Sequence, residues 1–342
     1  NPQKLLKEQK MTVKWFSYSS KLLVLAGGPT QSTIHAFFFK GTSIIKIPKF
    51  DLDTSGSSNN RILIKENQVT ICRLYDKVCC IHHQVAKKQL HLYQMNRESV
   101  SLSASINLSD EGNVIVHVVD NLLVCHNLKK QITSIFDIRE EESVVAAPLS
   151  PGETKIESKE IYGEEWIYCP ANYIIIPSKG LLCEVKVNLE GIICAFTKKR
   201  ILIDFLLRRT NSKQIILQQL QTLVREKSSL AVVSRIFKQV NAILQEYPER
   251  EDFEGVPAPT YNFQFMSSAL LSPQKQEERD SVRNMKRDGA VVITQSDMHK
   301  TVFLPMDTEE MDQKYFVAML VEYIRSLSHY KIEVLYFLYE MI

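Results

Sequence analysis

The amino-acid sequence predicts a β-rich half followed by an α-helical half, that is, a partial β-propeller that continues into α-solenoid helices. Two observations predict this fold class. Short apolar runs recur through the first half, and after Thr197 the apolar period changes from about two to about 3.6 residues. The predicted domains are propeller blades over 1–195, junction and first solenoid helices over 196–246, a disordered linker over 247–290, and truncated solenoid helices over 291–342.

The strand-like runs of the first half fall into four sets. Their first strands begin near Val13, Gln68, Val114 and Trp166, and this spacing of roughly 50 residues matches a four-stranded propeller blade. A closed propeller has roughly four to eight blades, so we expect N-terminal blades to be missing. The alternative is another antiparallel β sandwich. The predicted strands are Trp15–Tyr18, Leu22–Ala26, Ile34–Phe39, Ser43–Pro48, Val69–Leu74, Val78–His82, Gln89–Met95, Val100–Leu108, Val114–Val119, Leu122–His126, Ile132–Ile138, Trp166–Cys169, Tyr173–Pro177 and Leu181–Val187.

Two segments are predicted to be linkers. Glu140–Ile161 is acidic and contains Pro148 and Pro151, which indicates a long exposed loop between blades. Pro248–Arg287 is charged, has weak periodicity and contains three further prolines, so we expect it to be largely disordered.

Three helices are predicted directly after the strands. Ile201–Leu207 is apolar nearly all round, so this helix should be buried on most sides. Lys213–Arg225 forms the next helix, and Ser229–Glu246 the third, with Ser229 as a plausible N-cap. The apolar stripe of the third helix is formed by Val232, Val233, Ile236, Phe237, Val240, Ile243 and Leu244.

The last predicted helix begins near Asp307, where Glu310 would complete a capping box. The segment from Lys331 onward is expected to start its antiparallel partner. Helix pairs that cannot bury their apolar faces alone must stack, which favours a solenoid. The apolar face of the last helix is formed by Phe316, Met319, Leu320, Tyr323, Ile324 and Leu327.

Composition excludes some classes of protein. Lys and Arg number 22 against 20 Asp and Glu in residues 1–195, and 20 against 19 in residues 196–342, so neither half is basic enough to indicate nucleic-acid binding. Seven cysteines, scattered and odd in number, indicate reduced thiols in a cytosolic protein.

No apolar run approaches the roughly 20 residues of a membrane-spanning helix. The chain lacks an initiator Met and ends inside an apolar helical pattern, so we expect it to be a piece of a longer protein.

No catalytic, cofactor-binding or metal-binding residue is predicted. The segment Cys79–His83 is the most metal-like, but on a strand its Cys and His residues alternate between two faces, and no second ligand pair follows. Ser296 and Asp297 are interpreted as turn or cap groups, and the paired carboxylates as solvent-facing or capping groups. A propeller enzyme would need a funnel of convergent polar residues, and the sequence shows none.

A local basic cluster marks the junction between the strands and the helices. It could contact acidic lipid head groups or an acidic partner surface. The alternative is a solvated helix rim. The cluster comprises Lys198, Lys199, Arg200, Arg208, Arg209 and Lys213, of which Lys198, Lys199, Arg208 and Arg209 are the candidate contacts.

Several segments, taken together and in order, resemble a known family. Each segment alone is a weak signal, but their order and approximate spacing resemble the regulators of the Mon–Ccz complex, the Bulli-type proteins of animals, over nearly the whole chain. The segments are Leu5–Lys7 with Trp15-Phe16 and Ile47–Phe50, Val118–Leu122 with Ser134–Ile138, Asp204–Arg209, Gln295–Met298, and Glu322–Leu327.

The resemblance implies a propeller plus α-solenoid that forms a heterotrimer with the Mon and Ccz longin-domain subunits. It implies a non-catalytic role in the guanine nucleotide exchange complex for the late-endosomal Rab GTPase, which this subunit contacts only indirectly. The implied location is cytoplasmic, peripheral on late-endosome and lysosome membranes, with no cofactor and no nucleic acid. The resemblance carries over no single-residue functional motif. The alternative function is a subunit of a membrane tethering or vesicle coat complex.

Overall fold

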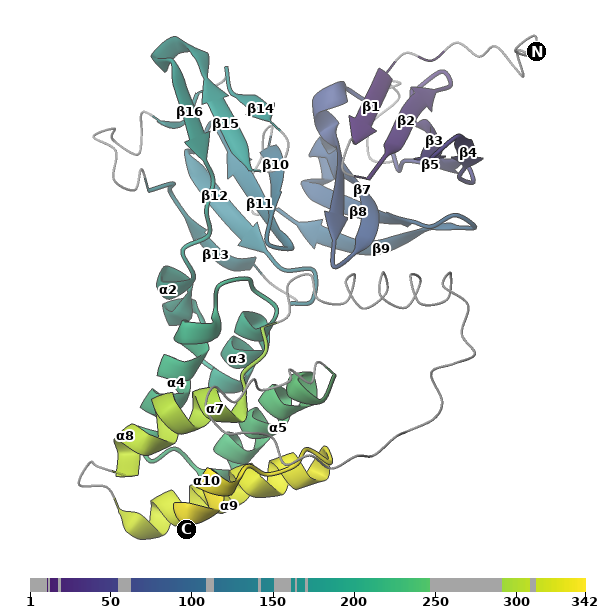
Figure 1. The fold of residues 1–342 in the computed structure, drawn as a ribbon. Coiled ribbons are helices and arrows are strands. Elements are labelled where there is room, and N and C mark those ends of the chain that lie inside the picture. The colour runs from purple at the N-terminus through teal and green to yellow at the C-terminus, as the bar shows by residue number, and fades with distance from the viewer. Residues whose placement is uncertain are drawn as a thin grey trace, which may run out of the picture. The chain divides into compact units, whose positions relative to one another are not determined.

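The computed structural model divides the protein into two compact units, residues 1–187 and residues 188–342. The first unit is built from antiparallel strands and the second from helices (Figure 1). A β-rich part followed by a helical part was the predicted fold class, and at this level the prediction is confirmed. The residues described are 11, 13–17, 20–54, 63–108, 114–140, 143–150, 161–163, 165–169, 172–246, 291–307 and 312–342, so the linker predicted over 247–290 lies outside them.

The first sheet pairs β1 to β4 in chain order, and β5 pairs with β3. Its side chains alternate strictly along β2, where Leu22, Val24 and Ala26 point to the buried face. Gly41 closes the β3–β4 hairpin with a positive φ of 57°, a conformation that glycine adopts without strain. The strands are β1 Val13–Ser17, β2 Leu22–Gly27, β3 Thr33–Lys40, β4 Ser43–Lys46 and β5 Phe50–Asp51.

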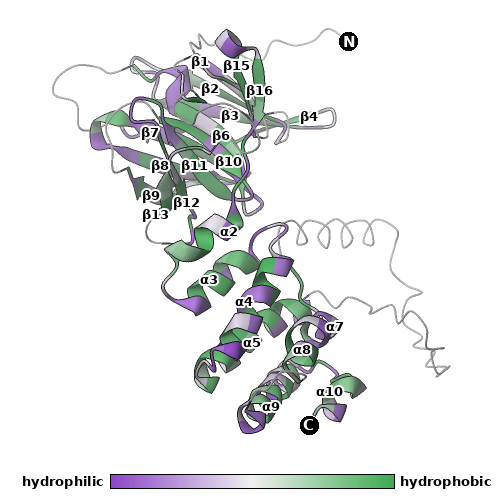
Figure 2. Ribbon diagram, turned by 90° about the vertical axis from the view of Figure 1, so that its left-hand side faces the viewer, coloured by the Kyte–Doolittle hydropathy of each residue, from purple (hydrophilic) through white to green (hydrophobic). Residues whose placement is uncertain are grey.

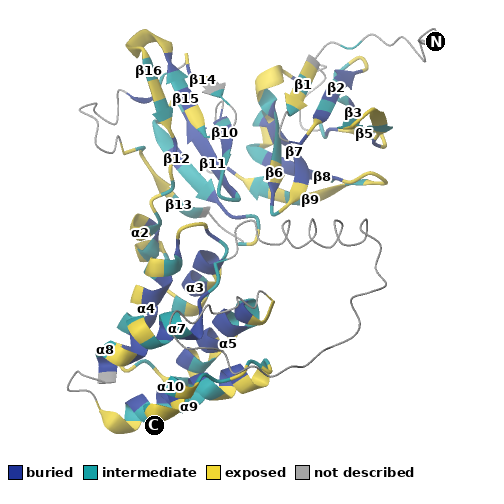
Figure 3. Ribbon diagram, in the orientation of Figure 1, coloured by how far each residue is buried: buried dark blue, intermediate teal, exposed yellow. Residues whose placement is uncertain are grey.

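The second sheet has four strands in chain order. The turn between β6 and β7 consists of Tyr75 and Asp76, both with positive φ, as a tight two-residue hairpin requires. Only Lys77 is exposed along β7, so this strand is buried on both faces (Figure 3). The strands are β6 Val69–Leu74, β7 Lys77–Gln84, β8 Gln89–Met95 and β9 Val100–Asn107, with the short 3-10 turns η1 Glu66–Gln68 and η2 Val85–Lys87.

The third sheet corrects one prediction. β13 lies inside the segment Glu140–Ile161, for which the sequence predicts a long loop, and it pairs with β12 across a bulge between Ile135 and Phe136. The acidic residues that favour a loop lie in the sequence on both sides of this strand, whereas the strand itself has the sequence SVVAA, whose valines favour β structure. The strands are β10 Val114–Val119, β11 Leu122–Asn127, β12 Ile132–Phe136 and β13 Ser143–Ala147.

The fourth sheet contains three strands among the described residues, each close to its predicted position. Asn172 fixes the start of β15, because its side-chain amide donates to the Val185 carbonyl oxygen at 2.8 Å. The strands are β14 Ile167–Cys169, β15 Tyr173–Ile176 and β16 Leu181–Glu184, with the 3-10 turn η3 Pro177–Lys179 between the last two.

Consecutive sheets share apolar cores. One buried cluster joins the first and second sheets, for example Val24 with Cys80, and another joins the second and third, for example Ile81 with Leu123. A third cluster joins the third and fourth sheets through Val124. β6 also lies beside both β1 and β10, so the first strands of three consecutive sheets are neighbours. Each sheet is open, and none of the four closes on itself.

The helical unit begins with α2 Leu189–Ile192, before the switch predicted near Thr197. α3 Lys199–Leu207 follows the turn η4 Ile193–Ala195, and its residues Phe205 and Leu206 are fully buried, as predicted from its all-round apolar pattern. α4 Lys213–Arg225 has the predicted bounds.

α5 Leu230–Glu246 begins directly after Ser229, whose carbonyl oxygen accepts from the Val233 amide. Its buried side includes Val233, Ile236, Phe237, Val240 and Leu244. Val232, predicted to lie in the same stripe, is 37% exposed. The stripe is therefore narrower than predicted, because Val232 lies one residue outside the row that the neighbouring helices cover.

Residues 295–307 form one continuous helical segment. It begins with α7 Gln295–Asp297, continues as the π-helix η5 Met298–Phe303, and ends with α8 Leu304–Asp307. Thr294 and Asp297 form a reciprocal capping box, which confirms the interpretation of Asp297 as a cap group.

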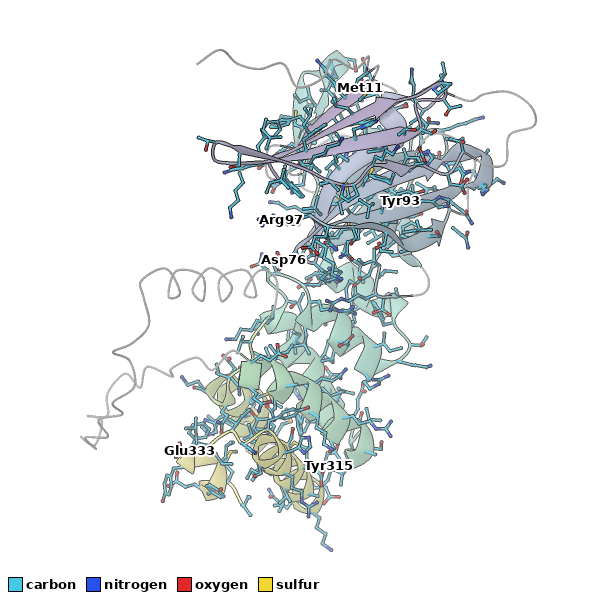
Figure 4. The ribbon with its side chains drawn as sticks, turned by 90° about the vertical axis from the view of Figure 1, so that its right-hand side faces the viewer. Met11, Asp76, Tyr93, Arg97, Tyr315 and Glu333 are labelled. Atoms are coloured by element: carbon cyan, nitrogen blue, oxygen red, sulfur yellow. The ribbon has the colours of Figure 1, made fainter. Side chains whose placement is uncertain are left out.

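The last two helices are α9 Gln313–His329 and α10 Tyr336–Glu340. The predicted start near Asp307 is wrong, because α8 ends there and Asp312 caps α9 by accepting from the Lys314 amide at 3.0 Å. α9 packs on α5. Figure 4 labels Tyr315 on α9, where its hydroxyl donates to the Ser228 carbonyl oxygen at 2.6 Å, and Glu333 in the segment before α10.

Candidate functional site

The predicted basic cluster lies on α3 and the start of α4, where three of its cations are engaged within the unit. Arg208 forms an ion pair with Asp204 at 3.2 Å, and the Lys213 ammonium lies 2.7 Å from the Asp297 carboxylate. Burial would raise the pKa of the Asp297 carboxyl, but hydrogen bonds from Lys213 and Thr294 lower it below its usual range. The ammonium of Lys199 donates to Gln219 at 3.3 Å.

Arg209 does not belong to a surface site, which corrects its assignment as a partner or lipid contact. Its side chain is fully buried, its guanidinium lies 4.7 Å from the centroid of the Phe205 ring, and its Nε donates to the Phe205 carbonyl oxygen at 3.3 Å. A cation over an aromatic face in a dry site is a strong packing contact. Lys198 is exposed at the N-cap of α3. Surface contact by Lys198, Lys199 and Arg208 stays a prediction.

The metal-like segment Cys79–His83 lies within β7, and its side chains alternate as predicted. Cys80 faces the core shared with the first sheet, and Cys79 faces the core shared with the third. Burial raises the pKa of the Cys79 thiol to about 11 and that of Cys80 to about 12, so both are protonated at neutral pH. Among the described residues, no group of three or more His, Cys, Asp or Glu side chains could hold a metal ion.

A buried chain of polar side chains crosses the third sheet, and the sequence did not predict it. The rings of His117 and His126 share a hydrogen bond of 3.2 Å, and His126 is 2.8 Å from the Thr133 hydroxyl. Thr133 is in turn 2.8 Å from the Tyr162 hydroxyl, which accepts from the Leu149 amide at 2.9 Å. The chain of contacts therefore joins β10, β11 and β12 to the residues before β14.

Burial decides what these histidines can do chemically. It lowers the pKa of His117 to about 4 and that of His126 to about 3, so both rings are neutral at pH 7. The Tyr162 ring stacks on Trp166 with centroids 5.7 Å apart, and the Trp166 indole donates to the Ile161 carbonyl oxygen. These contacts hold Leu149, Ile161, Tyr162 and Trp166 against the third sheet and against one another.

A second unpredicted polar contact links the second and third sheets. The Tyr75 hydroxyl, at the β6–β7 turn, donates to both oxygens of the Asp137 carboxylate at 2.7 and 2.8 Å. The Tyr75 amide donates to the Asn121 side chain, and the Arg139 guanidinium lies 4.1 Å from the Tyr75 ring centroid. The dipeptides Tyr75-Asp76 and Asp120-Asn121 can be identified in the sequence as turns between strands. The sequence does not reveal that these two turns contact each other.

Exposed apolar side chains mark the remaining surface candidates. On α10, Tyr336 and Tyr339 are 75% and 55% exposed, whereas Phe316 and Tyr323 on α9 are buried. The aromatic residues of the last two helices therefore divide between the core and the surface. No helix among the described residues has the length and apolar character needed to cross a bilayer.

Comparison with known proteins gives matches over both units. Residues 209–342 match the family model described as "Regulator of MON1-CCZ1 complex, C-terminal". The protein called "Regulator of MON1-CCZ1 complex" in Mus musculus is 25% identical, over 99% of this chain and 55% of the mouse protein, and the one in Homo sapiens is 26% identical with the same coverage. A "Regulator of MON1-CCZ1 complex homolog" of Dictyostelium discoideum is 30% identical, over 40% of this chain and 13% of that protein.

These matches confirm the resemblance predicted from the sequence segments. The chain spans about half the length of the mouse and human relatives. The family model covers α4 to α10, while the alignments with the mouse and human proteins extend through the strands as well.

Proposed function

We propose that this chain is a non-catalytic regulatory and scaffold subunit of the Mon–Ccz guanine nucleotide exchange complex. That complex activates the late-endosomal Rab GTPase, and so supports endosome maturation, lysosomal trafficking and autophagy. The observation that carries the proposal is the alignment of 99% of this chain with mouse and human proteins named as regulators of that complex. The match of residues 209–342 to the family model of the same name also supports it.

The proposed architecture is a partial β-propeller followed by the first helices of an α-solenoid. Two observations support the propeller. Consecutive sheets share apolar cores, and β6 lies beside both β1 and β10, as the innermost strands of neighbouring blades do. The pairing of α5 with α9 supports a solenoid, because each helix buries one face against the next.

The proposed partners are the Mon and Ccz longin-domain subunits, with the Rab GTPase contacted only through them. The proposed location is the cytoplasmic side of late endosomes and lysosomes, with peripheral membrane contact. A scaffold role fits the chemistry of the buried polar groups. The buried chain of polar side chains that begins at His117 and the Tyr75–Asp137 contact both lie inside the fold, where they join strands and sheets to one another.

Co-purification tests the proposal. The chain is mixed at micromolar concentration with the Mon–Ccz dimer, and size-exclusion chromatography measures whether the three elute together. A stable complex should bury more than roughly 1,600 Å² in total. Nucleotide release from the Rab GTPase, measured with and without the chain, then reports regulation.

Two other results would count against this assignment. Failure to co-elute would remove the proposed partners. Recovery of tethering or coat subunits by affinity capture and mass spectrometry would favour the alternative, a subunit of such a complex, which would use the same order of strands and helices.

A further inference from the structure

β9 forms one edge of the second sheet, where it pairs with β8. β6, at the opposite edge of the same sheet, lies beside both β1 and β10. Figure 2 shows β9 at the margin of the strand unit, beyond β7 and β8. The first and third sheets cover the two faces of the second sheet, so a blade placed before the first sheet would not pack on β9. This edge would be the same if further blades preceded the first sheet.

The backbone hydrogen bonds identify the groups of β9 that point away from β8. The Asn96 amide donates to the Ser99 carbonyl oxygen at 2.8 Å, and the Leu108 amide donates to the Lys88 carbonyl oxygen at 2.7 Å, so both are hydrogen-bonded pairs. Bonded and non-bonded pairs alternate along an antiparallel ladder. The alternation runs inward from both pairs through the register of the strands, and the β9 residues whose backbone groups point outward are Val100, Leu102, Ser105 and Asn107.

A β-bulge divides these four outward residues into two pairs. Leu92 lies opposite Ala104, whereas its neighbour Tyr93 lies opposite Leu102. Ser103 is therefore an extra residue in β9, and its hydroxyl donates to the Leu92 carbonyl oxygen at 3.0 Å. The outward residues on the two sides of the bulge are consequently three positions apart instead of two. Among the described residues, the structure records no backbone partner for the outward groups.

The side chains along this edge are uncharged. Residues 99–108 have the sequence SVSLSASINL, which contains no charged residue and no proline. Proteins protect edge strands with lysine, proline or a bulge, and this strand has only the bulge. Leu102 is 53% exposed, so apolar surface lies beside the outward backbone groups. An edge of this kind is complementary to another extended backbone.

We propose that β9 pairs with β9 of a second copy of this chain. The two strands run antiparallel about a two-fold axis, so that the second sheets of the two copies join into one sheet. Val100 then lies opposite Asn107 of the other copy, and Leu102 lies opposite Ser105 of the other copy. Every outward residue meets an outward residue, because the bulge lies at the same place in both strands. This pairing goes beyond the regulatory function proposed above and does not depend on it.

The bulge favours a second copy over a strand of another protein. A regular strand has its outward residues two positions apart throughout, so it can follow β9 only by leaving one β9 residue unopposed. A second copy has the same three-residue step, and the two-fold axis places the two steps opposite each other. Because residues 99–108 are uncharged, no like charges meet across the axis.

The expected dimer is weak and reversible. The axis generates four opposed outward pairs, and each pair exchanges two backbone hydrogen bonds, which gives about eight across the interface. Two paired edges bury less surface than the roughly 1,600 Å² of a stable interface. We therefore expect a dissociation constant on the order of tens of micromolar.

Sedimentation equilibrium of the chain without partner subunits tests the proposal. The average mass of the parent chain should rise from monomer toward dimer between about 5 and about 200 µM. Leu102→Pro and Ser105→Pro each remove an outward amide without breaking a bond to β8. Each should raise the dissociation constant about 30-fold, because the dimer loses two hydrogen bonds.

Ser101→Pro is the matched control for the direction of the backbone groups. Its amide belongs to a pair that is bonded to β8, so this substitution breaks the sheet itself. Thermal melting should show a clear loss of stability for Ser101→Pro and a much smaller change for Leu102→Pro and Ser105→Pro. Equal losses in the three variants would contradict the outward direction of the two proposed amides.

A charge-pairing experiment tests the register. Leu102→Lys and Ser105→Glu change positions that are opposite each other in the proposed dimer. Each variant alone should dimerise less than the parent, and an equimolar mixture should recover dimer, because the lysine of one copy meets the glutamate of the other. Leu182→Lys, at a leucine that is 67% exposed on β16, is the control. It should dimerise like the parent, and its mixture with Ser105→Glu should not gain dimer in the same way.

Three results would overturn the proposal. The parent chain could remain monomeric at about 200 µM. Folded variants of Leu102 and Ser105 could dimerise as well as the parent, or the mixture of Leu102→Lys with Ser105→Glu could recover no dimer. A monomeric parent whose β9 variants lose co-elution with the Mon–Ccz dimer would assign this edge to a strand of a partner subunit instead. Because sedimentation of the chain alone involves no partner subunit, its outcome is distinguishable from failure of the proposed complex.

Discussion

The Tyr75 hydroxyl donates to both oxygens of the buried Asp137 carboxylate, at 2.7 and 2.8 Å. Tyr75 sits in the β6–β7 turn and Asp137 follows β12, so this contact joins the second sheet to the third at one end of their strands. Asp137 is only 1% exposed and also accepts from the Arg139 amide at 3.0 Å. A buried carboxylate requires such donors, because an ionised group without them is unstable in a dry environment.

Substitution of Tyr75 should therefore weaken the strand unit. Tyr75→Phe removes both hydrogen bonds to the carboxylate while keeping the ring under the Arg139 guanidinium. We expect a loss of about 1.5–3 kcal/mol in the free energy of unfolding, the range for hydrogen bonds to charged groups. Urea denaturation measures it. Tyr173→Phe, at an exposed tyrosine of β15, is the control and should change the midpoint little.

Truncation of the α3 core should destabilise the helical unit. Phe205 is fully buried and contacts both the Phe196 ring, at a centroid distance of 5.0 Å, and the Arg209 guanidinium. Phe205→Ala or Leu206→Ala should cost about 2–5 kcal/mol, because each removes a large buried side chain. Thermal melting tests this, with Val232→Ala at a partly exposed position as the control. A melting temperature within a degree of the parent would contradict the burial argument.

The strand unit should lose stability in mild acid. Burial lowers the pKa of His82, His83 and His117 to about 4 and that of His126 to about 3, whereas in the unfolded chain each is near 6.5. The unfolded chain therefore binds more protons below about pH 6.5, and stability is complete above that pH and falls as pH drops toward 4. At pH 5 each histidine should cost roughly 2 kcal/mol relative to pH 7.5.

Urea midpoints at pH 7.5 and pH 5 measure this dependence. His126→Gln should make the pH dependence shallower, since it removes one of the protons bound on unfolding. A midpoint that rises on acidification would mean that these histidines gain charged partners in the folded state.

The segment before α10 should depend on one glutamine. The Gln295 side chain donates to the Glu333 carbonyl oxygen at 2.7 Å and accepts from the Leu335 amide at 3.0 Å. Gln295→Ala removes both contacts, so hydrogen exchange should rise at residues 333–340 by on the order of ten-fold, as the loss of two hydrogen bonds implies. Exchange in α4 should stay the same. Ser296→Ala is the neighbouring control, and equal exchange in the two variants would contradict the assignment.

Most element positions follow from local pattern. β2 alternates buried and partly buried residues, and α3 is apolar on most of its sides, so both were predictable from periodicity. β13 was not, because the acidic residues before it and the prolines after it outweighed a short run of valines and alanines. The start of α9 was misplaced because Asp307 and Asp312 both precede helical patterns, and the spacing does not reveal which one caps.

The candidate sites were less predictable. Lys198 and Arg209 look alike as cations in one cluster, yet one is exposed and the other is fully buried over Phe205. Sequence spacing does not reveal which side of a short helix meets the neighbouring helices. The Tyr75–Asp137 contact joins residues 62 positions apart and depends on how two sheets pack. β9 was predicted as a strand, but its place at the edge of a sheet became visible only in the fold.

The burial of β7 on both faces has a consequence for how the protein is made. Because the first and third sheets cover opposite sides of this strand, the β7–β8 hairpin leaves apolar surface in water until β10 to β12 have left the ribosome. Folding of the strand unit during synthesis must therefore be completed late, with nascent chains exposed to chaperones in the interval. Any change that slows translation of residues 77–136 should lengthen that exposure and raise aggregation of newly made chains.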